Sequence, residues 1–254
     1  MSEKQKLEGG NMNMVYKDGS TVIRSQGKWS PTIQRLLLHL ENVDFTACPK
    51  FLGINDHHQE VLTFVEGDCL ETYPDRVDKK KHIEGLRILG EKMRKLHDAT
   101  TSFVQRETDV WMVTYPGPLE KEVICHNDIA PYNVIFKNQM PHKFIDFDTS
   151  CPAPRIWDIV YALYRFVPFY QTADSVDWHH KSACVASFFQ AYGMACPENL
   201  FVMMQERLSA LADFILQEAN KGNACFKKML DEGHRDLYLS EIAYIKENQK
   251  NWES

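Results

Sequence analysis

The sequence has no excess of positive charge, no long uninterrupted apolar run and no apolar leader segment. Its net charge of −6 offers no electrostatic footprint for nucleic acid, and its one basic run, residues 79–81, stands beside Asp75 and Asp78. The first ten residues are polar, and charged residues and a proline interrupt the most apolar stretch, residues 156–170. We therefore expect no nucleic-acid partner, no signal peptide and no membrane span.

The cysteines and histidines also lack the spacing that is typical of disulfide frameworks and metal sites. The seven cysteines are scattered, odd in number and without a CxxC pair, which argues against disulfides and against a structural zinc site. The pairs His57-His58 and His179-His180 lack metal-ligand spacing with other donors, and we interpret them as surface or helix-capping residues. A reduced, cytoplasmic compartment is expected. The composition, 44% hydrophobic and 25% charged, is that of an ordinary globular chain.

The first quarter of the chain alternates between strand and turn signals. Residues 14–24 predict a hairpin that turns at Asp-Gly, and residues 51–54 and 60–65 predict two more strands. Ser30 followed by Pro31 predicts a helix N-terminus, with Ser30 as the N-cap, and an apolar stripe follows. Beyond residue 66 the apolar periodicity is mostly helical. These patterns predict a small sheet with one helix, followed by a larger, mainly helical region.

One segment, residues 123–148, places many polar side chains between apolar arms. Residues 133–137 and 142–146 are arms of equal length around the turn 138–141, so a hairpin would bring Asn133 opposite Asp146. Opposed residues in an antiparallel pair have Cα atoms about 4.5–5.5 Å apart. An amide oxygen and a carboxylate at that spacing suit Mg²⁺, which takes its remaining ligands from water and phosphates.

Asp128 precedes Asn133 by five residues, in a loop that Pro131 keeps from being helical. Its carboxylate could therefore reach a hydroxyl beside a metal-bound phosphate. His126 is expected to brace this loop rather than to react. The competing interpretation is an ordinary surface hairpin whose polar residues cap turns.

The order H-x-D-x-x-x-x-N followed by I-D-F-D resembles the aminoglycoside phosphotransferase family of kinase-like phosphotransferases. The resemblance implies a two-lobed, protein-kinase-like α+β fold. Residues 1–66 would form a small N-terminal, nucleotide-binding β-sheet lobe, and residues 67–254 a mainly helical catalytic and substrate-binding lobe. It also implies that Asp128 is the base or orienter of the substrate hydroxyl, and that Asn133 and Asp146 hold Mg²⁺ on ATP.

Further positions match the family less closely. Arg24 stands where such folds usually place a strand lysine against the ATP phosphates, and arginine can fork to two phosphate oxygens. The helix that should present a partner glutamate has no acidic residue before Glu41, so Arg24 is expected to lack its ion-pair partner. The alternative is an exposed strand arginine. Asp148 could touch a second metal or cap the following turn, and both remain open.

The resemblance also implies two contacts between the protein backbone and the nucleotide. Gly9 and Gly10 match the phosphate-covering turn, where backbone N–H groups approach an anion, although a flexible tail is an alternative. Val65 matches the connector between the lobes, where adenine would pair with backbone groups. A strand end without this role would have the same sequence.

The resulting expectation is an enzyme that transfers the γ-phosphate of ATP, with Mg²⁺, to a hydroxyl of a small molecule. The alternative is a nucleotide-binding, kinase-like module with little transferase activity. The acceptor is open, because a fold does not select one, and so is the oligomeric state. An aminoglycoside-like polycation would need acidic side chains and a quaternary amine would need an aromatic cage. The available acids are Glu206, Asp213, Glu218, Asp231 and Glu232, and the available aromatics are Trp111, Tyr115 and Tyr170.

Overall fold

The computed structural model describes residues 5–7, 15–170 and 177–252 of the 254-residue chain. The chain divides into two compact units, a first unit of residues 1–71 and 92–155 and a second unit of residues 72–91 and 156–254. Helix α2 (Lys79–Thr100) contributes residues to both units. The lobe boundary at residue 66 stays a sequence prediction.

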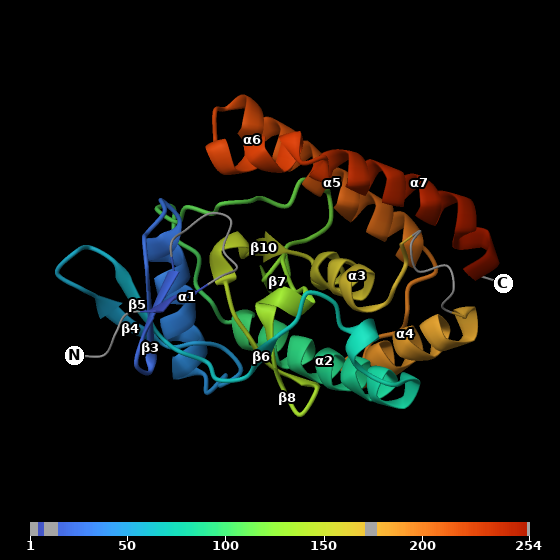
Figure 1. Cartoon of the computed structure of the whole chain (residues 1–254), viewed down its shortest axis with the longest axis horizontal. Helices are drawn as coiled ribbons and strands as arrows, with labels where there is room; N and C mark the ends of the chain where they lie inside the picture. Colours follow the sequence, from blue (N-terminus) through green and yellow to red (C-terminus); the bar gives the residue numbers. More distant parts are fainter. Residues whose placement is uncertain (1–4, 8–14, 171–176, 253–254) are drawn as a thin grey trace. The chain divides into compact units, whose positions relative to one another are not determined.

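The first unit contains a five-stranded antiparallel sheet in the order β1-β2-β3-β5-β4 (Figure 1). Its strands are β1 (Gln5–Lys6), β2 (Val15–Asp18), β3 (Thr21–Arg24), β4 (Phe51–Ile54) and β5 (Glu60–Thr63). The predicted hairpin is confirmed, since β2 and β3 pair around Gly19, whose φ of 60° suits a residue without a side chain. Both later strands are confirmed, and the second ends two residues earlier than predicted.

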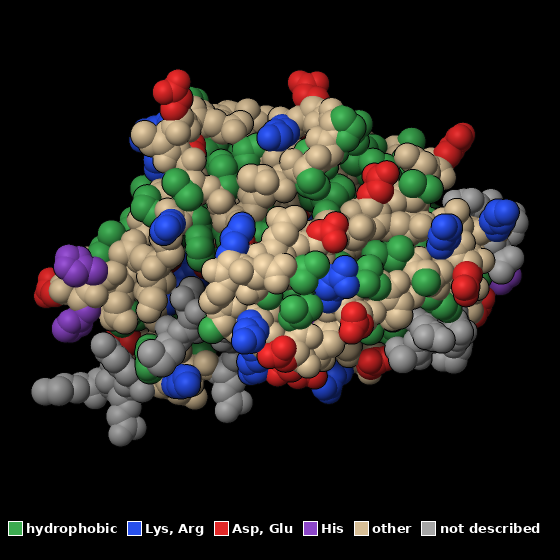
Figure 2. Space-filling view, turned by 90° about the horizontal axis from the view of Figure 1, so that it is seen from above, with side chains coloured by type: hydrophobic (Ala, Val, Ile, Leu, Met, Phe, Trp, Pro, Cys, Tyr) green, Lys and Arg blue, Asp and Glu red, His purple; other side chains and the backbone are tan. Residues whose placement is uncertain are grey.

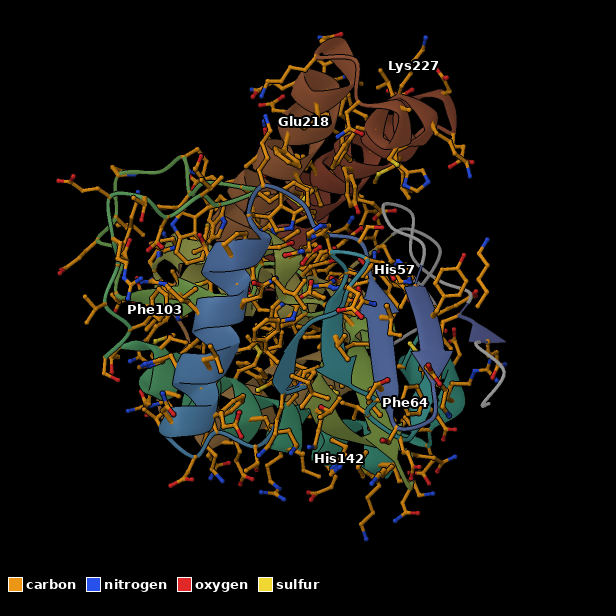
Figure 3. All side chains as sticks on the ribbon, turned by 90° about the vertical axis from the view of Figure 1, so that its left-hand side faces the viewer. His57, Phe64, Phe103, His142, Glu218 and Lys227 are labelled. Atoms are coloured by element: carbon orange, nitrogen blue, oxygen red, sulfur yellow. The ribbon has the colours of Figure 1, made fainter. Side chains whose placement is uncertain are left out.

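Helix α1 (Ser30–Asn42) lies beside this sheet and contacts β4 (Figure 3). Its predicted apolar stripe is confirmed, because the buried positions recur at helical spacing. The stripe consists of Ile33, Leu36, Leu37 and Leu40. The predicted N-cap is wrong by one residue. Ser30 is the first helical residue, and its hydroxyl accepts a hydrogen bond from the Gly27 N–H at 2.9 Å.

Two smaller sheets complete the first unit. One is three-stranded in the order β6-β8-β9, and the other pairs β7 with β10 in antiparallel fashion. Their strands are β6 (Asp68–Cys69), β7 (Val123–Cys125), β8 (Val134–Lys137), β9 (Met140–Phe144) and β10 (Cys151–Ala153). Gly67 precedes β6 with a φ of 143°, and a Cβ there would lie 2.5 Å from the Phe136 carbonyl oxygen. Only glycine allows β6 to approach β8 so closely.

The β8–β9 hairpin differs from its prediction. Lys137 pairs with Met140, so the turn is the two residues Asn138 and Gln139, both at positive φ, and not residues 138–141. The register also shifts at a bulge between Ile135 and Phe136. The predicted pairing of Asn133 with Asp146 is therefore wrong. Asn133 accepts a backbone hydrogen bond of 2.9 Å from the N–H of Ile145, one residue earlier.

The second unit is mainly helical, as predicted. Its helices are α3 (Arg155–Phe166), whose first residue belongs to the first unit, α4 (Trp178–Tyr192), α5 (Leu200–Asn220), α6 (Ala224–Asp231) and α7 (His234–Trp252). Short 3-10 turns are η1 (Pro74–Arg76) here and η2 (Pro131–Asn133) and η3 (Phe147–Thr149) in the first unit. Helix α5 packs against both α6 and α7 (Figure 1).

The distribution of charge, the hydropathy of the helices and the state of the cysteines bear on expectations from the sequence. Basic and acidic side chains are interspersed over the face shown in Figure 2. Among the residues described, no helix is both long enough and apolar enough to cross a bilayer. None of the seven cysteines, all of which lie in the described ranges, forms a disulfide.

The two histidine pairs have different outcomes. His57 and His58 are exposed at the tip of the β4–β5 hairpin, as expected, and Figure 3 shows His57 at the end of β5 opposite to Phe64. His179 is exposed and donates its N–H to the capping Asp177 carboxylate at 2.9 Å. The expectation is wrong for His180, which is buried at 8% exposure.

Candidate functional site

The loop that carries Asp128 and the segment that carries Asp146 extend from the same pair of strands. Strand β7 ends just before His126, and β10 begins just after Ser150. Cys125 is paired with Cys151 in this short sheet. Antiparallel pairing therefore brings two segments together that lie about 20 residues apart in the chain.

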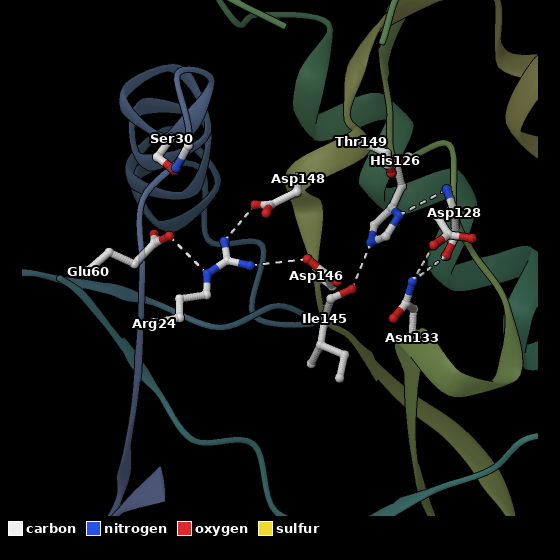
Figure 4. A network of polar contacts seen from close by, with 11 residues as sticks. Arg24, Ser30, Glu60, His126, Asp128, Asn133, Ile145, Asp146, Asp148 and Thr149 are labelled. Carbon is white, nitrogen blue, oxygen red and sulfur yellow. Dashed lines mark hydrogen bonds and ion pairs between the residues drawn. The ribbon is translucent and has the colours of Figure 1, made fainter. Parts of the chain in front are cut away.

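Hydrogen bonds lock these two segments to each other (Figure 4). The ring of His126 donates from Nε2 to the Ile145 carbonyl at 3.0 Å, because its Nδ1 accepts the Asp128 N–H at 3.3 Å. The Thr149 hydroxyl donates to the His126 carbonyl at 2.9 Å, and Asn127 Nδ2 donates to the Thr149 carbonyl at 2.9 Å. His126 is fully buried and uses both ring nitrogens in this brace, as expected from the sequence.

Asp128 and Asn133 are brought into direct contact. Asn133 Nδ2 donates to Asp128 Oδ2 at 2.8 Å and to the Asp128 carbonyl at 3.0 Å. The half-exposed Asp128 also accepts a 2.9 Å hydrogen bond on Oδ1 from the hydroxyl of Tyr132. Since the amide nitrogen is committed to Asp128, the Asn133 amide oxygen points to the other side (Figure 4).

Asp146 has left-handed backbone angles, φ 60° and ψ 70°, which a residue with a side chain adopts at some cost. Its carboxylate remains 46% exposed, although Oδ1 accepts a hydrogen bond from Arg24. An exposed carboxylate together with the oriented amide oxygen of Asn133 is a set of hard oxygen donors. This small set fits Mg²⁺, which keeps several waters and binds through few protein groups.

Arg24 is buried, with 7% exposure, and its guanidinium donates to three carboxylates at once (Figure 4). Nε contacts Glu60 at 2.9 Å, Nη1 contacts Asp146 at 3.1 Å and Nη2 contacts Asp148 at 2.7 Å. The partners of Arg24 thus come from β5 and from the segment after β9 and not from the helix where a partner glutamate was looked for, and the alternative of an exposed arginine is wrong. Helix α1 supplies no acid, but Arg24 and Glu60 are directly opposed in the β3–β5 register.

The charges in this cluster do not balance. Burial raises the pKa of Glu60, and the attraction of Arg24 only partly opposes this effect. Burial likewise raises the pKa of Asp148. Burial by itself would lower the pKa of Arg24, but the three carboxylates outweigh it and hold that pKa above its ordinary value. One guanidinium thus faces three acidic groups, and Glu60 Oε2 has no hydrogen-bond partner among the described residues.

Sequence reasoning missed Glu60 and Tyr132, and the pairing of Asp148 with Arg24 was neither of the roles considered for it. A glutamate at the start of a predicted strand was the available signal for Glu60. Val65 lies half-exposed in the segment between β5 and β6, where its adenine contact stays a prediction. Gly9 and Gly10 lie outside the described residues.

Known proteins resemble this chain over part of its length. Residues 111–200 match the family model of the phosphotransferase enzyme family. Trifolitoxin immunity protein of Rhizobium leguminosarum bv. trifolii is 31% identical over 156 residues, which cover 60% of this chain and 58% of that protein. Homoserine kinase of Zymomonas mobilis subsp. mobilis is 26% identical over 202 residues, which cover 76% and 55%. The chain thus spans somewhat more than half the length of these curated relatives.

Solved structures establish the fold. The streptomycin–ATP–APH(2″)-IIa ternary complex matches 96% of this chain and 94% of its own, with a TM-score of 0.60 at 12% identity. Plasmodium vivax ethanolamine kinase matches 99% and 83%, with a TM-score of 0.59 at 15% identity. The predicted kinase-like α+β fold class and the resemblance to the aminoglycoside phosphotransferase family are confirmed.

Proposed function

We propose that this chain is a small-molecule kinase that transfers the γ-phosphate of ATP, with Mg²⁺, to a hydroxyl group. The observation that carries the proposal is the joint placement of Asp128, Asn133 and Asp146 on two segments locked together by hydrogen bonds. The fold shared with aminoglycoside and ethanolamine kinases supports it. ATP and Mg²⁺ are parts of the proposal.

Each residue has a distinct task in this proposal. Asp128 orients the acceptor hydroxyl and takes its proton at the carboxylate, since that carboxylate is half-exposed and fixed by Asn133. Asn133 and Asp146 hold Mg²⁺, which when bound neutralises phosphate charge during transfer. Arg24 adds fixed positive charge beside Asp146. By resemblance, Val65 binds adenine through its backbone and Gly9 and Gly10 cover the phosphates.

The decisive experiment is single-turnover transfer from labelled ATP to a panel of amino alcohols, amino acids and aminoglycosides. Asp128→Asn is expected to lower the transfer rate by about 10²-fold or more, because a positioned general base contributes about that much. Asp56→Asn, at an exposed site in the β4–β5 turn, is the matched control and should leave the rate unchanged. Equal rates for wild type and Asp128→Asn would show that the assignment is wrong.

A second function has one specific observation in its favour. Arg24 already engages Asp146, one of the two residues proposed to hold Mg²⁺, at 3.1 Å. A protein that binds nucleotide with little transfer would be consistent with this contact. Measurement of Mg-ATP binding beside turnover separates the two functions. Tight binding with no transfer to any acceptor favours the binding module, and robust transfer eliminates it.

The acceptor is proposed only as a small amino or hydroxy compound. The names of the two curated relatives, an immunity protein and a homoserine kinase, point in different directions. Among the acidic candidates, Glu218 pairs with Lys221 at 2.7 Å and Glu232 with Lys228 at 3.7 Å, so lysines already offset part of their charge. Among the aromatic candidates, Tyr115 is buried. The acceptor panel is therefore the route to the substrate.

A further inference from the structure

Three buried side chains of the second unit converge on one point. His82 Nδ1 and His180 Nε2 lie 2.9 Å apart, and the Cys184 sulfur lies 3.6 Å from the first and 3.7 Å from the second. Their exposures are 2%, 8% and 0%. The reaction proposed above uses none of them. Two nitrogens and a sulfur that face one another in this way form a potential metal-ligand set.

Two helices bring the three residues together. His180 and Cys184 are four residues apart on α4, so they share one face of that helix. His82 lies in the first turn of α2. The helices approach closely, since a Cβ added to Gly90 of α2 would lie 2.5 Å from the Phe188 carbonyl oxygen of α4. Because Gly90 has no side chain, the face of α2 that carries His82 can contact the face of α4 that carries His180 and Cys184.

The distances match those around a bound cation. Zinc–nitrogen bonds of about 2.0–2.1 Å and a zinc–sulfur bond of about 2.3 Å in a tetrahedron place nitrogens about 3.3 Å apart and nitrogen about 3.6 Å from sulfur. Both nitrogen–sulfur distances agree within about 0.1 Å. The two nitrogens are about 0.4 Å closer, as a direct N–H···N hydrogen bond requires. Little movement of the side chains would admit the ion.

The surroundings of His82 also suit a ligand. Its Nε2–H donates to the Phe166 carbonyl at 2.8 Å, which fixes the tautomer and leaves the lone pair on Nδ1 directed at the cluster. Metal-binding histidines usually have such a partner on the other ring nitrogen.

We propose that His82, His180 and Cys184 bind one zinc ion that joins α2 to α4, with the fourth coordination position left to a small ligand such as water. When Zn²⁺ binds, the Cys184 S–H bond breaks, a zinc–sulfur bond forms and one proton enters the solvent. The proton of His180 that now lies on Nε2 moves to Nδ1. The competing interpretation is a hydrogen-bonded histidine pair beside an inert core thiol.

The test uses the metal-free chain of residues 1–254 and Co²⁺ as a spectroscopic probe, followed by displacement with Zn²⁺. One ion per chain is expected, with the intense tetrahedral d–d bands and a sulfur-to-cobalt charge-transfer band. Cys184→Ser should remove the charge-transfer band and weaken Zn²⁺ binding at least tenfold. Cys196→Ser, which alters an exposed cysteine, is the matched control and should change neither.

Two results would overturn the proposal. One is no Co²⁺ or Zn²⁺ bound at millimolar metal, and the other is binding that Cys184→Ser leaves intact. A measurement on the zinc-loaded wild-type protein does not depend on how the variants fold. X-ray absorption should show one sulfur at about 2.3 Å and two nitrogens at about 2.0–2.1 Å. A shell of nitrogen and oxygen alone would assign the ion to surface groups such as His57 and His58, and the proposal would fail.

Discussion

The guanidinium of Arg24 joins two separate segments of the first unit. Its planar guanidinium presents donors in a fixed fork, so it reaches Glu60 on β5 and both aspartates of the 145–150 segment at once. A lysine ammonium at the family position is a compact point charge, which cannot span three separated carboxylates in this way. Arginine and lysine are therefore not interchangeable at this position, because Arg24 ties the sheet to the segment that carries Asp146.

The imbalance between one cation and three carboxyl groups predicts unequal effects of substitution. Arg24→Gln leaves Glu60, Asp146 and Asp148 without their cation, two of them buried, and should lower the free energy of unfolding by about 3–5 kcal/mol. Glu60→Gln removes one of three competing carboxylates and should cost about 1 kcal/mol. Urea unfolding of each purified variant measures both values.

The pH dependence of the Glu60→Gln effect provides an internal control. Because the folded-state pKa of Glu60 is raised, its protonated form is favoured by folding, and its contribution is lost as the pH rises through that pKa. Glutamine does not titrate. The destabilisation caused by Glu60→Gln should thus be smaller at pH 8 than at pH 5. A larger effect at pH 8, or equal costs for the Glu60 and Arg24 variants, would contradict the charge-imbalance argument.

Tyr132 gives a second prediction at the residue scale. Its hydroxyl donates to Asp128 Oδ1, so an acceptor hydroxyl that needs this oxygen must displace it. Tyr132→Phe should lower the KM for the acceptor about tenfold or more, since a hydrogen bond to a charged group is worth about 1.5–3 kcal/mol. It should leave kcat close to that of wild type, because this hydrogen bond is already broken once the acceptor is bound. Steady-state kinetics with the best acceptor measure both constants. A fall in kcat as large as that of Asp128→Asn would instead make Tyr132 part of the transfer step.

At the scale of elements, the sequence predicted local structure but not the pairing of residues that lie far apart in the chain. The hairpin of residues 14–24 and the apolar face of α1 follow from turn chemistry and helical period, and both are confirmed. The pairing of Arg24 with Glu60 depends on β5 lying between β3 and β4, an order that no short stretch encodes. His180 and Cys184 had a readable helical spacing, but His82 is 98 positions away from His180.

The β8–β9 hairpin shows a different kind of failure. Equal apolar arms favoured a four-residue turn, but the chain uses a two-residue turn and absorbs the difference in a bulge. Neither Asn138 nor Gln139 is glycine, although both have positive φ, so the usual sequence signal for such a turn is absent at the second position. The candidate site still forms, because hydrogen bonds to His126 and Thr149 place the segments independently of hairpin register.

This turn carries the prediction at the element scale. Gln139 has a φ of 65°, a conformation that costs a non-glycine residue about 1 kcal/mol. Gln139→Gly creates the Asn-Gly pair that this turn type prefers and should raise the free energy of unfolding by about 0.5–1 kcal/mol. Lys137→Gly, two residues earlier in strand conformation, is the control and should lower it. Urea unfolding that shows Gln139→Gly to be destabilising would contradict this account of the turn.

On the scale of the whole molecule, the two proposals assign a different ligand to each compact unit. The groups proposed for Mg-ATP belong to the first unit, and the proposed zinc ligands belong to the second. A ligand that binds only the folded state stabilises it by about 2.7 kcal/mol at a concentration one hundred times its Kd. Binding stabilises the unit that holds the ligand against local unfolding by the same relation. Amide hydrogen exchange can therefore show which unit each ligand stabilises.

Hydrogen exchange with each ligand in turn therefore tests both assignments in one protein. Saturating Mg-ATP should slow exchange most in β3, β5 and residues 126–148. Asp146→Asn should abolish the portion of this protection that depends on Mg²⁺. Zn²⁺ should slow exchange most in α4 and the first turns of α2, and Cys184→Ser should abolish that effect while the response to Mg-ATP persists. Protection by Mg-ATP centred on α4, or by Zn²⁺ centred on residues 126–148, would mean that the ligands have been assigned to the wrong units. Loss of both responses in Cys184→Ser would identify a folding defect, and X-ray absorption of the wild-type protein would then decide the zinc assignment.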